Sequence, residues 1–432
     1  MSQTGSVRVV SEKEKRKALF ASFIGSAIEW YDFFIYGTAV ALVFNEIFFP
    51  SFDPFVGLLL SYVTFSVTFF IRPLGGAVFG HIGDKVGRKT SLVLTLVLMG
   101  GATFLIGILP DYNTIGIVAP ILLLLFRCVQ GIGIGGEWSG AMLLAVEYSE
   151  DKKRGFFGSI PQLGVPVGLV LGTITFSLLT MLPEASFLAW GWRIPFILSA
   201  VLVLIALWIR STLDETPIFQ EAREQGTIKK APILETLRNH WKMVLVGVAL
   251  VAGTTCPFYI FSNFSIAYST NYLGIDRSFI LNAITIATII TMFTIPLFGK
   301  ISDRIGRKTI YLSCLLSILV FAVPYFYFMS LASGTAIVIA TIVGFILWSV
   351  GWSIQGTMYA EMFSTDVRYT GMTLGYQLGA AIAGGSAPII ALLLLDKYET
   401  WVPLSLIIII ATVLSLVALY YFRVSKDMQT EG

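Results

Sequence analysis

Five charged side chains lie inside long apolar runs of the sequence, where charges are rare. They are Glu29, Asp32, Arg72, Arg127 and Glu137. A charge at the centre of a membrane helix costs about 2.5–3.5 kcal/mol on insertion scales, so each of these residues is a candidate for function. The three carboxylates and two guanidiniums carry one net negative charge, which one bound proton would cancel. Static ion pairs, Arg72 with Glu137 or Asp32 with Arg127, are the alternative interpretation.

Proton transfer within this set is a task for a carboxylate, because arginine keeps its proton in proteins. Burial and a like-charged neighbour favour the protonated form of a carboxylate, whereas a nearby arginine favours the ionised form. Glu29 and Asp32 are three residues apart and therefore share one face of a helix. We predict a proton-coupling set, given with the favoured carrier first and the next candidate second: Asp32, Glu29, Arg127 and Glu137.

The second half of the sequence has neutral polar and aromatic residues inside its apolar runs instead of charges. A guanidinium suits a carboxylate ligand, and a box of aromatic rings suits a quaternary amine. Packing and lipid contact are the alternative roles of the aromatic residues. The predicted substrate-binding residues are Arg127, Arg72, Tyr36, Gln130, Tyr259, Asn263, Trp348, Trp352, Gln355, Tyr376 and Gln377.

The composition indicates the elements that must hold these residues. The chain has 432 residues, of which 56% are apolar and only 13% are charged, against about 25% charged in soluble domains. This is the composition of an integral membrane protein. A spanning helix needs about 20 mainly apolar residues. The runs that qualify are 18–46, 55–80, 89–109, 114–141, 155–182, 190–210, 242–273, 278–300, 308–330, 334–361, 369–395 and 400–423.

Internal repeats divide these twelve runs into two halves. The stretch 80–90 matches 299–309 at seven of eleven positions, and Glu147 with Arg154 has the same spacing as Glu361 with Arg368. Such self-similarity indicates a tandem duplication. We therefore predict an all-α membrane protein with twelve transmembrane helices in two six-helix bundles. The expected domains are an N-terminal bundle at 1–210, a charged cytoplasmic linker at 211–241 and a C-terminal bundle at 242–432.

The repeated stretches also predict gating contacts. Their glycines, aspartate and bases suit short polar loops at the membrane surface. Asp84 or Asp303 is expected to cap a helix N-terminus, while the bases that follow pair with acids or helix C-termini of the other bundle. Breaking these contacts would open the cytoplasmic side. The predicted gating residues are Gly80, Asp84, Gly87, Arg88, Asp303, Arg307, Glu147, Arg154, Glu361 and Arg368.

Orientation follows from the basic residues, which gather in cytoplasmic loops of membrane proteins. With loops assigned alternately, Arg193, Arg277 and Lys397 fall on one face, and Arg72 and Arg127 lie inside spans. The other 24 of the 29 lysines and arginines fall on the opposite face. Both termini are therefore expected to be cytoplasmic.

Several motifs resemble those of a known family. The stretch from Gly80 to Lys89 resembles the signature loop of the major facilitator superfamily, and Arg127 with Gln130 and Gly131 resembles its fourth-helix motif. More narrowly, four stretches resemble the metabolite:proton symporter family, which includes transporters of shikimate, α-ketoglutarate, and proline or betaine. They are 29–33 (EWYDF), 72–76 (RPLGG), 135–138 (GGEW) and 191–196 (GWRIPF). The resemblance implies two bundles around a midplane cavity, alternating access by rocking, and proton symport.

The expected function is that of a proton-coupled symporter that imports a small organic acid. The alternative is a proton-coupled symporter of compatible solutes such as betaine or proline. The apolar runs hold no Ser/His/Asp or Cys/His set, and two histidines in the whole chain do not make a metal cluster. We expect no enzyme activity, cofactor, metal or nucleic-acid partner. The expected partners are a small-molecule substrate, protons and the lipid bilayer, with a functional monomer in a bacterial plasma or inner membrane.

Overall fold

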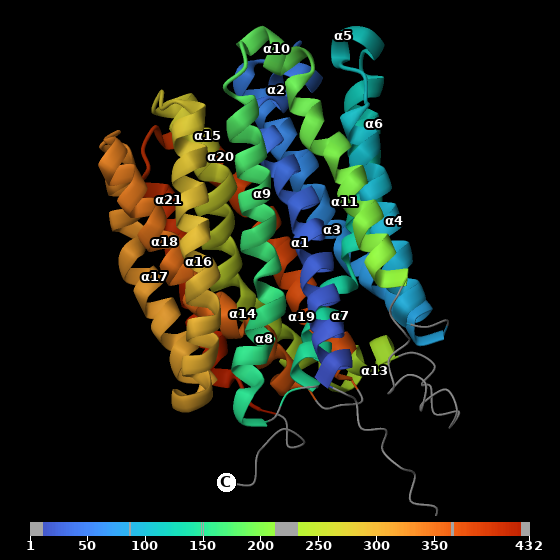
Figure 1. Cartoon of the computed structure of the whole chain (residues 1–432). Coiled ribbons are helices and arrows are strands. Elements are labelled where there is room, and N and C mark those ends of the chain that lie inside the picture. The colour runs from blue at the N-terminus through green and yellow to red at the C-terminus, as the bar shows by residue number, and fades with distance from the viewer. Residues whose placement is uncertain are drawn as a thin grey trace, which may run out of the picture.

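The computed structural model describes residues 12–85, 88–147, 149, 151–211, 232–363 and 367–424. All regular elements in these ranges are helices, and Figure 1 shows the long ones running side by side. The predicted all-α fold class is confirmed. Two ends of the molecule are used below as landmarks: the α10 end, where α2, α5 and α10 lie, and the α13 end, where α13 and the start of α8 lie (Figure 1).

Several helices of the first half are too short to span a membrane on their own. In chain order the elements of this half are α1 (Glu12–Leu42), α2 (Phe44–Phe48), α3 (Pro54–Lys85), α4 (Arg88–Gly107), α5 (Tyr112–Ile115), α6 (Val118–Ile134), α7 (Glu137–Glu147), η1 (Asp151–Lys153), α8 (Arg154–Gln162), α9 (Gly164–Leu179), α10 (Glu184–Ala189), η2 (Gly191–Arg193) and α11 (Ile194–Ser211).

The second half contains three π-helical segments, η3, η4 and η5, inside otherwise α-helical spans. Its elements are α13 (Pro232–Asn239), α14 (Trp241–Tyr259), η3 (Ile260–Phe264), α15 (Ser265–Ala267), η4 (Tyr268–Tyr272), α16 (Arg277–Ile305), α17 (Arg307–Ser330), α18 (Gly334–Met362), α19 (Arg368–Ala380), η5 (Ala381–Gly385), α20 (Ala387–Tyr398) and α21 (Val402–Tyr421).

Ten helical segments of the described residues are long and apolar enough to cross a membrane. They correspond to ten of the predicted runs. The other two runs, 18–46 and 89–109, also fold as helices, in α1 with α2 and in α4. Several spans consist of consecutive helices, such as α6 with α7 and α8 with α9. The predicted transmembrane helices are therefore present, although their boundaries shift by several residues.

Contacts are dense within each half and also join the two. In the first half α1 packs on α9, α3 on α6, and α4 on α11; in the second, α14 packs on α19 and α21, and α17 on α18. The halves meet where α8 and α9 pack on α16 (Figure 1), α8 on α18, and α3 on α19. Most of the predicted linker lies outside the described residues, and the division into two bundles stays a prediction.

Over the described residues, which leave out 86 and 87, the repeated stretches are mainly helical, so the prediction that they form loops is wrong there. α3 continues through Gly80 to Lys85, and α16 continues through Gly299 to Ile305. Only Gly306 separates α16 from α17, and its φ of 91° lies in the left-handed region that favours glycine. Gly299 has a different reason to be glycine. A Cβ added there would lie 2.8 Å from the carbonyl oxygen of Gly155, so this glycine allows α16 to approach α8 closely.

Candidate functional site

Arg72 and Arg127 lie in an aromatic cluster in the middle of the molecule. Arg72 is 2% exposed and Arg127 is fully buried. The Cζ atom of Arg72 is 4.7 Å from the ring centroid of Phe33 and 4.4 Å from that of Phe69. The Cζ atom of Arg127 lies 3.7 Å from the ring centroid of Tyr36 and 5.8 Å from that of Phe33. Both guanidiniums therefore face the same Phe33 ring, where cation–π contacts are strengthened by the exclusion of water.

Close packing of α3 against α6 holds Arg72 in this position. A Cβ added at Gly135 would lie 2.2 Å from the carbonyl oxygen of Arg72, and one at Gly75 would lie 2.2 Å from the carbonyl oxygen of Ile132. Neither position has room for a larger residue. Gly75 belongs to the stretch 72–76, which contains Arg72, and Gly135 belongs to the stretch 135–138, which contains Glu137. The two glycines therefore hold the backbones of these two charged residues close together.

The two arginines differ in their hydrogen bonds. Arg127 donates from Nε to the carbonyl oxygen of Thr64 (3.3 Å), from Nη2 to that of Phe65 (3.1 Å) and from Nη1 to Oε1 of Gln130 (2.7 Å). Nε and Nη2 of Arg72, in contrast, have no hydrogen-bond partner among the described residues. Arg127 is therefore held by α3 and α6, whereas Arg72 has two donor groups available for a ligand.

Asp32 is 1% exposed and accepts hydrogen bonds from two hydroxyl groups. Thr103 on α4 donates to Oδ2 (3.0 Å), and Ser199 on α11 donates to Oδ1. Thr103 also accepts a hydrogen bond of 2.7 Å from Nε2 of Gln130. Asp32 and Arg127 are thus connected through Gln130 and Thr103 and do not form a direct ion pair.

The other two acids of the predicted proton-coupling set are also buried. Glu29 and Glu137 are each 4% exposed. No ion pair between Arg72 and Glu137 is found among the described side chains, so neither of the two static pairs considered from the sequence forms here.

The predicted aromatic residues of the second half stack with one another and with residues of the first half. Trp348 stacks on Phe258 (4.3 Å between ring centroids) and on Trp352 (5.5 Å). Tyr376 stacks on Trp138 of α7 at 4.0 Å. The faces of these rings are therefore already covered in this structure.

Tyr259 is the residue of this group that joins the arginine cluster. Its ring lies edge-on to Phe69 at 5.1 Å and to Phe33 at 5.9 Å. Tyr259 belongs to α14, so the second half contributes directly to the surroundings of Arg72. Tyr36, also predicted, donates to Oγ1 of Thr64 (2.6 Å) below the guanidinium of Arg127.

The three predicted amide residues of the second half make separate contacts. Asn263 occupies the π-helical segment η3, and its main-chain carbonyl oxygen accepts a hydrogen bond of 3.3 Å from Tyr62. Gln355 accepts from Thr254 at 2.8 Å, and its Nε2 has no partner among the described residues. Gln377 donates to the carbonyl oxygen of Gly135 (3.0 Å), which joins α19 to the backbone beside Glu137.

Several residues of the site did not stand out in the sequence. Thr103 and Ser199 carry no signal, because hydroxyl residues are common in apolar helices. Gln162 could have been found, since it is a side-chain amide inside the predicted span 155–182. It accepts from Nε1 of Trp138 (3.1 Å) and donates to the carbonyl oxygen of Trp352 (2.9 Å), which joins α7 and α8 to α18.

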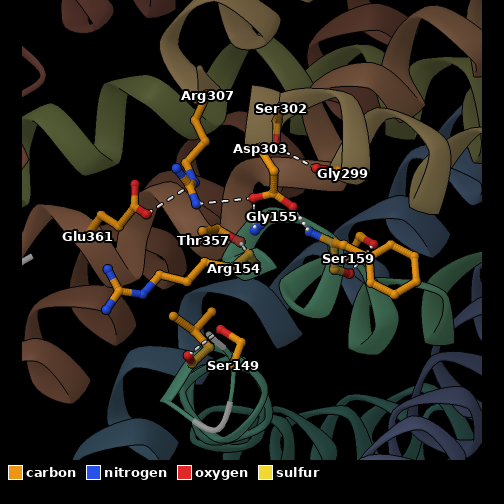
Figure 2. A network of polar contacts seen from close by, with 12 residues as sticks. Ser149, Arg154, Gly155, Ser159, Gly299, Ser302, Asp303, Arg307, Thr357 and Glu361 are labelled. Atoms are coloured by element: carbon orange, nitrogen blue, oxygen red, sulfur yellow. Dashed lines mark hydrogen bonds and ion pairs between the residues drawn. The ribbon is translucent and has the colours of Figure 1, made fainter. Parts of the chain in front are cut away.

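At the α13 end, Asp303 joins the two halves (Figure 2). Its Oδ1 accepts from the backbone N–H of Gly155 (2.7 Å) and its Oδ2 from that of Phe156 (3.0 Å). These groups form the first turn of α8, where a carboxylate satisfies free N–H groups and meets the positive end of the helix dipole. The prediction that Asp303 caps a helix N-terminus is confirmed.

The predicted pairing of Arg307 with the other half is wrong. Its Nε lies 3.1 Å from Oε1 of Glu361 and its Nη2 lies 3.3 Å from Oδ1 of Asp303, and both acids belong to the second half. Figure 2 shows Arg154 of the first half extending toward Glu361 from the opposite side. Arg368 is buried and donates to the carbonyl oxygen of Phe363 (3.2 Å). Gly87 lies outside the described residues, as do the side-chain positions of Gly80, Asp84, Arg88 and Glu147.

Polar contacts also join the halves at the α10 end. Arg277 lies 3.7 Å from Glu46 and 3.6 Å from Glu184. Thr173 and Thr285 share a hydrogen bond of 2.7 Å deeper in the same interface. The ion pairs are partly exposed and therefore weak. The halves are thus in contact at both ends, and the ion pairs at the α10 end are more exposed than Asp303 at the α13 end.

Asp303→Asn is expected to loosen the α13 end. Asparagine keeps one acceptor oxygen but places an amide N–H₂ opposite an N–H donor and loses the charge at the helix terminus. Losing the charge at a helix terminus costs about 0.3–1 kcal/mol, and up to about 2 kcal/mol at a partly buried site, so the population open at this end should rise by roughly 2- to 30-fold. The labelling rate of a cysteine introduced at Thr357, which contacts α8 through the carbonyl oxygen of Arg154, measures this access.

Asp276→Asn is the matched control for this experiment. Asp276 caps its own helix, α16, by accepting from the N–H of Phe279 (3.0 Å), so this variant removes the charge of a helix cap without changing a contact between the halves. Its labelling rate at Thr357→Cys should equal that of the background. Equal rates in Asp303→Asn and Asp276→Asn would show that Asp303 does not hold this end closed.

Comparison with known proteins identifies the fold and the family. The model of the Major Facilitator Superfamily matches residues 22–384. The shikimate transporter of Escherichia coli K12 is 41% identical over 90% of both chains. A glycine betaine/proline/ectoine/pipecolic acid transporter of Dickeya dadantii is 35% identical over 96% of this chain and 84% of its own.

A solved structure of the proton:xylose symporter XylE covers 95% of this chain and 96% of its own, with a TM-score of 0.77 and 16% identity, which shows the shared fold. The matched relatives are transporters and not enzymes. The chain is therefore a multi-pass membrane transporter that belongs to the major facilitator superfamily and, within it, to a family of metabolite transporters.

Proposed function

We propose that the chain is a proton-coupled symporter that imports a small organic acid by alternating access. The observation that carries this proposal is Arg72. Its guanidinium is buried, and two of its nitrogen atoms have no partner among the described residues. A buried charge is costly unless it is paired. A carboxylate provides two acceptor oxygens that match the fork of a guanidinium, so an organic acid is the ligand that best suits this residue.

The surroundings of Arg72 suit the rest of such a ligand. Phe33 and Phe69 of the first half and Tyr259 of the second half provide aromatic surface beside the guanidinium. A ligand there would touch both halves, which is what a site between two moving bundles requires. We propose Arg72 as the first contact of the acid. The other predicted substrate-binding residues stay proposals, and Tyr259 and Tyr36 are the two whose rings lie beside the arginine cluster.

Asp32 is the proposed proton carrier. It is buried, and its hydrogen-bond donors among the described residues are neutral hydroxyl groups, so one protonation event changes the charge of the core by one unit. In the proposed cycle the bundles 1–210 and 242–432 rock about this region, joined by the linker 211–241. We assign the cytoplasmic side to the α13 end from the expected distribution of basic residues, and we propose that Asp303 and the residues around it hold that side closed. The protein is proposed to work as a monomer with both termini in the cytoplasm, in a bacterial inner membrane.

Symport of betaine or proline is the alternative, supported by the aromatic residues of the second half and by the relative from Dickeya dadantii. A quaternary amine would need open ring faces. Trp348 and Tyr376 stack on other rings, so these faces would have to separate first. The relative with the higher identity, 41% against 35%, is named as a transporter of shikimate, which is a carboxylic acid. Both points favour the acid.

Uptake into proteoliposomes tests the proposal. With an inward proton gradient, labelled shikimate should accumulate above its external concentration, and a protonophore should remove the accumulation. Excess unlabelled carboxylic acids should compete, and excess betaine should not. Competition by betaine or proline in the absence of competition by any carboxylate would favour the alternative. Uptake that is independent of the gradient would contradict proton symport.

A further inference from the structure

We infer that Thr103 and Ser199 are positioning residues that set the pH at which Asp32 binds and releases its proton, and that Gln130 connects this event to Arg127. The inference rests on the proposed function, because it takes Asp32 as the proton carrier. It concerns a contiguous chain of buried side chains drawn from α1, α4, α6 and α11.

Each carboxylate oxygen of Asp32 has its own hydroxyl donor. Ser199 of α11 donates to Oδ1, and Thr103 of α4 donates to Oδ2 at 3.0 Å. Both hydroxyl residues are fully buried. Hydrogen bonds donated to a carboxylate favour its ionised form. Without these two donors, the negative charge of Asp32 would lie in apolar surroundings, and the protonated form would persist to a higher pH.

Thr103 has a suitable partner in both protonation states of Asp32. Its hydroxyl lies 2.9 Å from the carbonyl oxygen of Met99 as well as 3.0 Å from Asp32. A hydroxyl group has one proton to donate and two lone pairs. When Asp32 is ionised, Thr103 donates to it. When Asp32 is protonated, Asp32 donates to Thr103, and the hydroxyl proton turns to Met99.

Gln130 connects the hydroxyl group of Thr103 to Arg127. Its Nε2 donates to Thr103 at 2.7 Å, and its Oε1 accepts from Arg127 at 2.7 Å, so the orientation of the amide is fixed at both ends. Arg127 in turn shares the Phe33 ring with Arg72. A ligand that moves Arg127 would therefore change the hydrogen bond that Gln130 makes to Thr103. This gives a physical connection between the arginine cluster and the carboxylate.

The charged and titratable residues near Asp32 do not take over the role of the two hydroxyl groups as partners of its carboxylate. Tyr31, the titratable residue beside Asp32 on α1, donates its hydroxyl to the carbonyl oxygen of Pro195 (2.9 Å). α9, the helix with the most extensive packing on α1, carries no charged residue. Among the described side chains, no lysine or arginine lies within 4 Å of the Asp32 carboxylate. The other charged or titratable residues in the buried core around α1 include Glu29, Tyr36, Tyr62, Arg72, Arg127, Glu137 and Tyr259, whose ring lies 5.9 Å from that of Phe33.

The test measures protonation of Asp32 directly and needs no transported substrate. Infrared difference spectra of the purified full-length protein in lipid are recorded as the pH is changed, and the C=O band of the protonated Asp32 carboxyl is identified by its loss in Asp32→Asn. In Thr103→Val and in Ser199→Ala, the midpoint of this band should move to higher pH by about one unit, the shift expected when one hydrogen bond to a charged group is lost. Gln130→Met should move it in the same direction by less, because the hydroxyl loses a donor that strengthens its own bond.

Two variants serve as controls. Thr103→Ser keeps the hydroxyl and should restore the wild-type midpoint. Thr412→Val removes a buried hydroxyl that donates only to the carbonyl oxygen of Ile408 in its own helix, and it should leave the midpoint unchanged. This control separates the loss of a donor to Asp32 from the general effect of a threonine-to-valine change in a membrane helix.

The possible failures can be told apart. An unchanged midpoint in both Thr103→Val and Ser199→Ala would overturn the inference and leave Asp32 as the carrier. If Asp32→Asn removes no titrating band, the proposed carrier itself is wrong. An unchanged midpoint in Gln130→Met alone would remove the connection to Arg127. If Thr103→Val does not fold, Ser199→Ala decides whether the hydroxyl donors set the midpoint.

Discussion

Asp32→Asn is expected to abolish accumulation of the substrate against its gradient while exchange of substrate across the membrane continues. The amide has nearly the same shape as the carboxyl group and can still accept a hydrogen bond from Thr103 or Ser199, but it does not ionise. The variant should therefore cycle without a proton. One pH unit is worth about 1.4 kcal/mol, or about tenfold in concentration for one coupled proton. With a gradient of one pH unit, the ratio of internal to external substrate should therefore be as much as about tenfold in the wild-type protein and about one in Asp32→Asn.

Accumulation in proteoliposomes with an imposed pH gradient measures this ratio, and counterflow at equal pH measures exchange. Asp276→Asn is the control, since it makes the same substitution at an exposed helix cap and should accumulate substrate normally. Full accumulation by Asp32→Asn would disprove its role as the carrier. If Glu29→Gln then fails to accumulate substrate, the proton is carried by Glu29, the other buried acid on α1.

The fold was accessible from the sequence because the length and composition of an apolar run are local properties. The five charged residues of the first half were found for a similar reason, since a charge inside an apolar run is conspicuous wherever the helix packs. The structure buries all five. A capping role for Asp303 was predictable from its residue type, but the helix that it caps, α8 of the other half, was not.

Other features depend on the rotation and packing of helices, which the sequence does not reveal. Thr103 and Ser199 meet at Asp32 only because α4 and α11 turn these faces toward α1. The repeated stretches contain glycine and aspartate, residues typical of loops, yet 80–85 and 299–305 are helical. In the second stretch, Gly299 allows α16 to lie against α8. Arg307 pairs within its own half because α18 brings Glu361 to it.

Arg72→Gln is expected to lower the affinity for a carboxylic acid by at least about 30-fold. Removing one partner of a desolvated charge pair costs about 2–5 kcal/mol, and each 1.4 kcal/mol is about tenfold in affinity. Arg72→Lys should recover part of the loss, since it restores the charge without the fork that binds both carboxylate oxygens. The KM for shikimate exchange, or the dissociation constant for the purified protein, measures the effect. Arg423→Gln, an exposed residue beyond α21, is the control and should not change either value.

The same variant separates the two substrate classes. A zwitterionic substrate held mainly by aromatic rings would lose little affinity in Arg72→Gln. If this variant loses affinity for the carboxylic acid but binds betaine as before, the amine binds at a site other than Arg72. An unchanged affinity for the acid would instead leave Arg127 as the anion contact. All three donor nitrogens of Arg127 are bonded to Thr64, Phe65 and Gln130, so it could bind an acid only by giving up one of these bonds. Because α3 supplies two of these acceptors, that outcome would require α3 to move when substrate binds.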